Sequence, residues 1–323
     1  MRSIELRKKL FKIYSDNLKF VMEKYKIQLG IESENGIIES NTPLYICPLC
    51  LNAFSEELVE QHFKNPLTIE DLPPKAVGGN PKILTCKRCN NESGYSLDKL
   101  IIETLRTESF IKKIPASNIN SLIKINDGKR FRAISEIGEK GEIKFILKTK
   151  NNPILRNQLK DLRKIWDGST INFNFSSPNL KKYENSLVRI GLLLSFYYLG
   201  NRVLFEGSYN RIRKFVLEPE KNELPHKGVI IFPENTNIEE GLHILVKPER
   251  YRTFFIVFKI KYKTLIKTIA VPFPGPGIIG WDKYSNFSEI SKEVDVKFIK
   301  ITSSDYVNDK TRVDGYDILY ENL

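Results

Sequence analysis

Cysteine and histidine are scarce in this chain of 323 residues, which has four cysteines and three histidines. The cysteines form two CxxC pairs, Cys47 with Cys50 and Cys86 with Cys89, and none is left over. In a cytosolic chain such pairs favour a metal clamp over disulfides. The stretch MRSIELRKKLFKIY is charged at helical spacing and lacks the uninterrupted apolar core of a secretory signal.

Long apolar runs are also lacking. The most apolar stretch is VRIGLLLSFYYLG, from Val188 to Gly200, which is too short to span a bilayer and contains Arg189. We therefore expect a buried helix here, a cytoplasmic location and no association with membranes.

Basic residues outnumber acidic ones, with 51 lysines and arginines against 39 aspartates and glutamates, so that the formal net charge is +12. Nucleic acid is the commonest polyanion that such a protein meets. A composition rich in lysine throughout gives the same charge without such a partner, so both interpretations stay open.

The hydrophobic periodicity predicts an α+β protein with three parts. Residues 1–43 should form a basic amphipathic helix, to about residue 30, and then a linker with the turn-rich composition GIESENGIIESNTP. Residues 44–114 should form a small module with a short helix over 52–63, two short strands in LTIEDL and PKILTC, and a helix from Asn90. Residues 115–323 should form a larger mixed α/β domain.

In that larger domain the patterns predict a meander, a helix, the buried helix and four further strands. These lie, in order, at SLIKI, KRFRAISEI and EIKFILKT, then NPILRNQLKDLRKIW, then NSLVRIGLLLSFYYLG, then GVIIF, LHILVK, RTFFIVFKIKY and TLIKTIAVPF, with a PFPGPG loop at 272–277. Arg211, Arg213 and Lys214 either extend a nucleic-acid groove or form an ordinary helix face. The domain could equally bind a regulatory protein.

The two cysteine pairs predict a structural zinc ion. Four thiolates suit the tetrahedral preference of zinc, and each CxxC turn delivers two of them. The gap from Cys50 to Cys86 is longer than in an ordinary zinc ribbon, so a further element is inserted between the pairs. A redox dithiol is a weaker interpretation, because it would have to explain two well-separated pairs.

The inserted segment contains adjacent acids, Glu70 and Asp71, at the end of a predicted strand. Neighbouring strand residues point to opposite faces, so both can meet one ion only if the strand bends. Pro73 and Pro74 supply a break, and Asn90 opens the following helix, where its amide oxygen can face the acids. Carboxylate and amide oxygens suit magnesium or manganese.

Taken together, CPLC, IEDLPPKAVGG and LTCKRCNN resemble the zinc-bracketed HNH endonucleases over about residues 45–100. The resemblance implies a ββα-metal core between two CxxC knuckles that hydrolyses DNA, and a role in antiviral defence. Glu70 matches the acidic metal ligand and Asn90 the ligand after the last cysteine. Asp71 stands where the family has its general base, a histidine.

Asp71 departs from the family pattern, because aspartate has an ordinary pKa of about 3.9 against about 6.5 for histidine. Burial and Glu70 could raise the pKa of Asp71, or Asp71 could join the metal shell so that the ion activates water. Alternatively His62 could act as the base, or the module could bind without cutting. We therefore expect a metal-dependent HNH-type endonuclease, with a degenerate zinc-stapled nucleic-acid-binding or adaptor protein as the alternative.

Basic side chains surround the predicted site and could hold phosphates of DNA, or of RNA as an alternative substrate. The residues concerned are Lys75, Lys82, Lys87 and Arg88. In the helix that follows, Asn91 is expected to cap the first turn, and Asp98 to form a salt bridge rather than to bind the ion.

Overall fold

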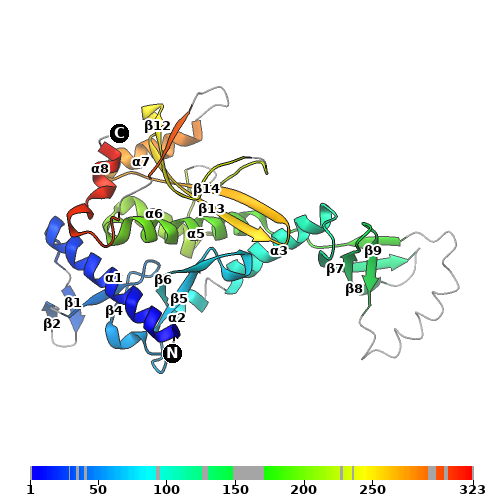
Figure 1. The fold of residues 1–323 in the computed structure, drawn as a ribbon, viewed down its shortest axis with the longest axis horizontal. Coiled ribbons are helices and arrows are strands. Elements are labelled where there is room, and N and C mark those ends of the chain that lie inside the picture. The colour runs from blue at the N-terminus through cyan, green and yellow to red at the C-terminus, as the bar shows by residue number, and fades with distance from the viewer. Residues whose placement is uncertain are drawn as a thin grey trace. The chain divides into compact units, whose positions relative to one another are not determined.

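The computed structural model describes residues 2–28, 30–33, 36–39, 42–91, 95–125, 130–147, 171–225, 228–234, 236–289, 296–301 and 305–321. Helices and sheets are both present, which confirms the predicted α+β class. The chain divides into two compact units (Figure 1). Unit 1 comprises Met1–Lys99, Lys181–Lys261 and Ile266–Leu323, and unit 2 comprises Leu100–Leu180 and Tyr262–Leu265. These units differ from the three predicted parts, because the cysteine pairs share a unit with most of the C-terminal half.

The first helix of unit 1, α1 (Arg2–Tyr25), confirms the predicted N-terminal helix. Its buried side chains include Phe11, Tyr14, Leu18 and Val21, which recur at helical spacing. Asn17 lies on the same face, and its amide nitrogen donates hydrogen bonds to carbonyl oxygens near the C-terminus, those of Tyr306 and Val307.

The expected linker after α1 is in part a hairpin. Strands β1 (Gly30–Ser33) and β2 (Gly36–Glu39) pair antiparallel, with Ile31 opposite Ile38. Short strands therefore form within a segment whose turn-like composition predicted a linker.

The cysteine-containing segment begins with strands β3 (Leu44–Ile46) and β4 (Ala53–Ser55), which pair around the first knuckle. A 3-10 turn, η1 (Glu56–Val59), follows, so the predicted helix over 52–63 is wrong. The sequence suggested a helix, but closure of the knuckle puts Ala53–Ser55 beside β3 and leaves room for only one turn.

Strands β5 (Leu67–Leu72) and β6 (Asn80–Cys86) form an antiparallel hairpin, as predicted, with a 3-10 turn η2 (Lys75–Val77) between them. The short helix α2 (Lys87–Cys89) carries the second knuckle, and α3 (Tyr95–Ile111) confirms a helix after Asn90.

Helix α5 (Leu180–Leu199) confirms the predicted buried helix. Within unit 1 it contacts both the cysteine-containing segment and the C-terminal sheet. At Gly191 an added Cβ would lie 2.8 Å from Cβ of Val271, so the helix is in close contact with a strand of the C-terminal sheet. Arg189 lies two residues earlier, about 200° around the helix, and its side chain meets Glu70 of β5. Helix α5 therefore connects the cysteine-containing segment to the sheet (Figure 1).

That sheet contains five strands in the order β11-β14-β13-β12-β15. It confirms the four strands predicted after α5 and adds a fifth. The strands are β11 (Ile230–Ile231), β12 (Gly241–Lys247), β13 (Thr253–Tyr262), β14 (Leu265–Phe273) and β15 (Lys297–Lys300). The loop predicted at 272–277 is shorter and comprises residues 274–276, because β14 extends to Phe273 and α7 (Gly277–Asn286) begins at Gly277.

Other short elements complete unit 1. After α5 the chain forms a 3-10 turn, η4 (Gly200–Phe205), and then helix α6 (Gly207–Leu217), which contains the basic segment. In α6 the buried and the charged residues each recur at a helical period. The C-terminus ends in α8 (Gly315–Glu321). Further 3-10 turns are η5 (Glu249–Tyr251), η6 (Phe287–Glu289) and η7 (Lys310–Arg312).

By length and apolar composition alone, the helical segment Leu180–Phe205 could cross a membrane. However, 83% of its apolar window is buried inside the protein, as expected of a core helix.

Unit 2 is a four-stranded antiparallel sheet in the order β10-β7-β8-β9. The strands β7 (Asn118–Ile125), β8 (Arg130–Ile137) and β9 (Ile143–Ile146) confirm the predicted meander, and β10 (Ile171–Asn174) adds to its edge. Phe110, Ile119 and Ile137 form its small core. The helix predicted at 152–166 lies outside the described residues.

Candidate functional site

The four cysteines form a candidate metal centre. Their sulfur atoms all lie within 4.8 Å of one another, and those of Cys50 and Cys86 are 3.8 Å apart. Within the described ranges this is the only group of three or more cysteine, histidine or acidic side chains gathered so tightly. The cluster could hold a metal ion such as zinc, because four thiolates at this spacing suit tetrahedral coordination.

Backbone hydrogen bonds shape each knuckle. The amide of Cys47 donates to the Asn52 carbonyl, and the amide of Leu51 donates back to the Cys47 carbonyl. In the second knuckle the amide of Cys89 points at the Cys86 sulfur, 3.5 Å away, and the amide of Cys86 points at the Cys47 sulfur at the same distance. Amides directed at sulfur stabilise thiolate charge. Separately, a hydrogen bond with the side chain of Cys47 lowers the pKa of Cys50 to about 6.

Two arginines offset that negative charge. Arg213 of α6 is buried, and its Nε donates a 2.8 Å hydrogen bond to the carbonyl of Pro48 inside the first knuckle. Burial lowers the pKa of Arg213 to about 10, and the nearby Cys47 and Cys50 oppose this effect. Arg88 is exposed, and the charge of Cys50, followed by those of the other nearby thiols, raises its pKa. The proposal that Arg213 extends a nucleic-acid groove is therefore wrong, because its guanidinium is buried against the knuckle.

The β5–β6 hairpin bends where the two acids occur. The pairing register shifts between Glu70 and Asp71, which is the irregularity that lets neighbouring side chains leave the strict alternation of a strand. Gly78 has φ of +96°, in the left-handed region, and a Cβ on Gly79 would lie 1.4 Å from the carbonyl oxygen of Pro73. The double glycine is thus required for the chain to turn back onto itself.

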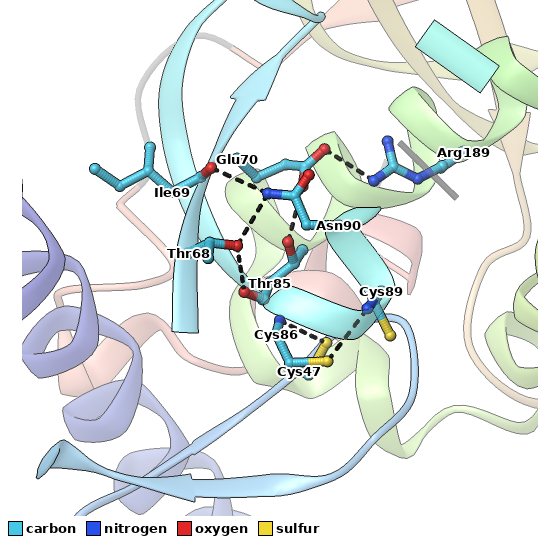
Figure 2. Close-up of polar contacts among 9 residues, drawn as sticks. All are labelled: Cys47, Thr68, Ile69, Glu70, Thr85, Cys86, Cys89, Asn90 and Arg189. Atoms are coloured by element: carbon cyan, nitrogen blue, oxygen red, sulfur yellow. Dashed lines mark hydrogen bonds and ion pairs between the residues drawn. The ribbon is translucent and has the colours of Figure 1, made fainter. Parts of the chain in front are cut away.

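Glu70 is buried and points into the protein rather than towards solvent (Figure 2). Its Oε1 accepts a 2.9 Å hydrogen bond from Nη2 of Arg189, and its Oε2 accepts a 2.8 Å hydrogen bond from Oγ1 of Thr85. The side chains of Arg189 and Glu70 are only 1% and 5% exposed. Both carboxylate oxygens are therefore occupied by buried donors.

Asn90 turns its amide nitrogen towards β5 (Figure 2). Its Nδ2 donates to Oγ1 of Thr68 at 2.9 Å and to the carbonyl oxygen of Ile69 at 3.4 Å. This fixes the start of the helical region against the strand and directs the amide oxygen away from those two acceptors.

Two further carboxylates lie in the electrostatic field of Glu70. Burial raises the pKa of Asp71 above its usual value, while Lys75 lowers it and Glu70 raises it. Burial also raises the pKa of Asp98 to about 6, with Arg189 lowering it and both Glu70 and Asp71 raising it. Glu70, Asp71 and Asp98 therefore lie close enough for their charges to act on one another.

These observations limit which residues fit a divalent ion. Glu70 does not fit as a ligand, because both of its oxygens are engaged and a guanidinium lies beside it. Asp71 is partly exposed, and its carboxylate and the amide oxygen of Asn90 are of the donor type that magnesium or manganese uses.

The four basic side chains predicted to contact phosphate lie in different environments. Lys75 is exposed and acts on Asp71, and Lys87 is exposed on α2. Lys82 is half-buried, with its Nζ 4.6 Å from the ring centre of Tyr197, so it is a cation–π partner of α5. Arg88 faces the thiols. His62 is exposed, 3.4 Å from Glu60, and stacks on Phe63.

Sequence reasoning missed Thr85 and the role of Arg189, which had served only as an argument against a membrane span. An arginine inside an otherwise apolar helix was the available signal, since a buried charge requires a partner. Its partner could not be read from the sequence, because Glu70 lies 119 positions earlier.

No protein-family model, curated protein or solved structure matches the chain.

Proposed function

We propose that the chain is an HNH-type endonuclease that hydrolyses phosphodiester bonds in DNA with magnesium or manganese, and that its four cysteines hold a structural zinc ion. The observation that carries the proposal is the order of elements around the thiol cluster. A two-stranded hairpin, β5–β6, has Glu70 and Asp71 at a bulge and is followed by the second knuckle, Asn90 and a helix. This is the order that the resemblance to HNH endonucleases requires.

Asp71 is the candidate general base. Its side chain is partly exposed, so a water molecule can reach it. Burial raises its pKa, and the charge of Glu70 adds to the effect against the opposing charge of Lys75. A higher pKa makes Asp71 a stronger base than an ordinary aspartate, which partly compensates for the missing histidine.

Asp71 and Asn90 are the residues that would hold the divalent ion. Magnesium commonly uses one or two carboxylates and keeps several of its waters, so a small protein donor set is sufficient. When bound, the ion supplies Lewis-acid stabilisation of the leaving oxygen. Lys75, exposed next to Asp71, would hold the substrate phosphate in place.

The zinc ion would serve the fold rather than the reaction. Four thiolates leave no open coordination position for a substrate. The hairpin and knuckles have little core of their own, so metal binding would contribute to folding. Arg213 and Arg88 lie where they offset the excess negative charge of a tetrathiolate centre.

A second candidate is a degenerate module that binds nucleic acid without cutting it. The buried pair of Glu70 and Arg189 favours this alternative, because it withdraws the acid that matches the metal ligand of the family. The net charge of +12 supports nucleic-acid binding under either function.

Nicking of a supercoiled plasmid separates the two candidates. Wild type should nick with Mg²⁺ or Mn²⁺ and stop in EDTA, while Asp71→Ala and Asn90→Ala should lose about a hundredfold or more. Asp282→Ala, at an exposed position of α7, is the matched control and should cut normally.

Two results would contradict the endonuclease. If wild type binds DNA in a gel-shift assay but never nicks it, and Asp71→His does, the module is degenerate. If Asp71→Ala cuts as well as wild type, Asp71 is not the base.

A further inference from the structure

Glu70, the acid that matches the metal ligand of the HNH pattern, already has a cation. Arg189 lies 2.9 Å away, and the two side chains are almost completely buried. Thr85 donates to the other carboxylate oxygen. The carboxylate thus has one ionic and one neutral donor, both fixed by the fold.

The buried guanidinium of Arg189 needs a carboxylate beside it to offset its charge. It belongs to α5, whose neighbouring residues from Leu187 to Leu194 are all buried. An isolated guanidinium in such surroundings is strongly unfavourable, so the charge needs a fixed partner. Gly191 lets the opposite side of α5 approach Val271, which leaves the helix little freedom to move Arg189 away.

A divalent ion at Glu70 would have to compete with this guanidinium. Two cations on one carboxylate repel each other, and the repulsion is strong where water is excluded. Asp71 differs from Glu70, because it is only partly buried and can exchange water for an ion.

We propose that Arg189 is the resident counter-cation of Glu70, so that Glu70 is a positioning residue and any divalent ion at this site is held without it. Glu70 and Arg189 then join the hairpin to α5 and keep the bulge at Asp71 in shape. This inference deepens the proposed function by deciding which acids remain for the ion, but it does not require that the protein cuts DNA.

Mn²⁺ binding to the full-length, zinc-loaded protein tests the proposal, with the ion alone as the probe and the electron paramagnetic resonance signal of free Mn²⁺ as the measurement. We expect Glu70→Gln to change the Mn²⁺ dissociation constant by less than about twofold, and Asp71→Asn to weaken binding about tenfold or more. Glutamine preserves the shape and the acceptor oxygen of Glu70, which protects the fold. A tenfold loss in Glu70→Gln would overturn the proposal.

Thermal melting of the zinc-loaded protein, with no other divalent ion added, tests the pairing independently of the second ion. Arg189→Met and Glu70→Gln should each lower the melting temperature, and Arg189→Lys should lower it less than Arg189→Met. The double variant Glu70→Gln/Arg189→Met should melt above Arg189→Met alone, because it no longer buries an unpaired carboxylate. Additive losses would show that the two side chains are not coupled and would also overturn the proposal.

The two measurements also separate this inference from the proposed function. If wild type neither binds Mn²⁺ nor nicks DNA, but the double variant melts above Arg189→Met, the endonuclease proposal fails and the Arg189–Glu70 pair stands. If wild type nicks DNA and Glu70→Gln abolishes Mn²⁺ binding, the endonuclease stands and the inference fails.

Discussion

Asp98 provides a prediction that connects the acidic site to stability. Its carboxyl group lies on α3, and burial raises its pKa to about 6, with Arg189 opposing the rise and the charges of Glu70 and Asp71 adding to it. An aspartate in an unfolded chain has a pKa of about 3.9. The folded protein therefore binds this proton more tightly than the unfolded chain does.

The sign of the effect on stability follows from that difference. At a pH below about 4 the group is protonated in both states and has no effect. As the pH rises from about 4 to about 6, the unfolded chain loses the proton first, and the folded state is penalised progressively. Above about pH 6 the penalty is complete, so Asp98 destabilises the fold at neutral pH.

A pKa difference of about 2 corresponds to about 3 kcal/mol. Because Asp98 is only partly buried, solvent screening reduces this to roughly 1–2 kcal/mol. We expect Asp98→Asn to increase the free energy of unfolding by this amount at pH 7.5 and to have little effect at pH 4. Asp282→Asn on α7, at an exposed position, is the matched control and should change stability by less than about 0.5 kcal/mol.

Urea denaturation of the zinc-loaded protein, with no other divalent ion added at first, is followed by tyrosine and tryptophan fluorescence at both pH values and measures the difference. Mn²⁺ should then narrow the gap between wild type and Asp98→Asn at pH 7.5, since a bound cation offsets the repulsion among the acids. The reasoning is refuted if Asp98→Asn destabilises the protein at pH 7.5, because Asp98 would then stabilise the fold in its charged form.

Three other perturbations probe the rest of the site. Removal of the metal by a strong chelator should cost the fold its cooperative unfolding transition, and a calorimetric transition unchanged after dialysis would argue against a structural ion. Gly79→Ala should lower the free energy of unfolding by more than about 3 kcal/mol in the same urea assay, because its Cβ would clash with the Pro73 carbonyl. Gly207→Ala is the control and should be nearly neutral, because a Cβ there meets open space. Arg213→Met should release zinc to a colorimetric chelator faster than wild type does. Arg211→Met should not, because the guanidinium of Arg211 lies over the half-buried ring of Trp281.

Local patterns were sufficient for most elements of this protein. The spacing of apolar residues in α1 and α5, and the alternation in β12, β13 and β14, identify helices and strands because a buried face must recur at the period of its own backbone. The predictions failed where local preference was weak. The stretch Ala53–Ser55 became a strand because closure of the knuckle placed it beside β3, and Gly30–Ser33 and Gly36–Glu39 pair as strands in spite of their turn-rich surroundings.

The sequence by itself determined which residues could form the metal site, because each CxxC turn supplies two thiols and Glu70, Asp71, the double glycine and Asn90 follow in order along the chain. The two cysteine pairs meet only in the tertiary structure, where the sulfur atoms of Cys50 and Cys86 lie 3.8 Å apart across 36 positions. Only the tertiary structure decided which of those residues are free to act. Arg189 reaches Glu70 across 119 positions and Arg213 reaches Pro48 across 165. Buried charges choose their partners by proximity in three dimensions, and the low dielectric of the interior makes that choice energetically decisive.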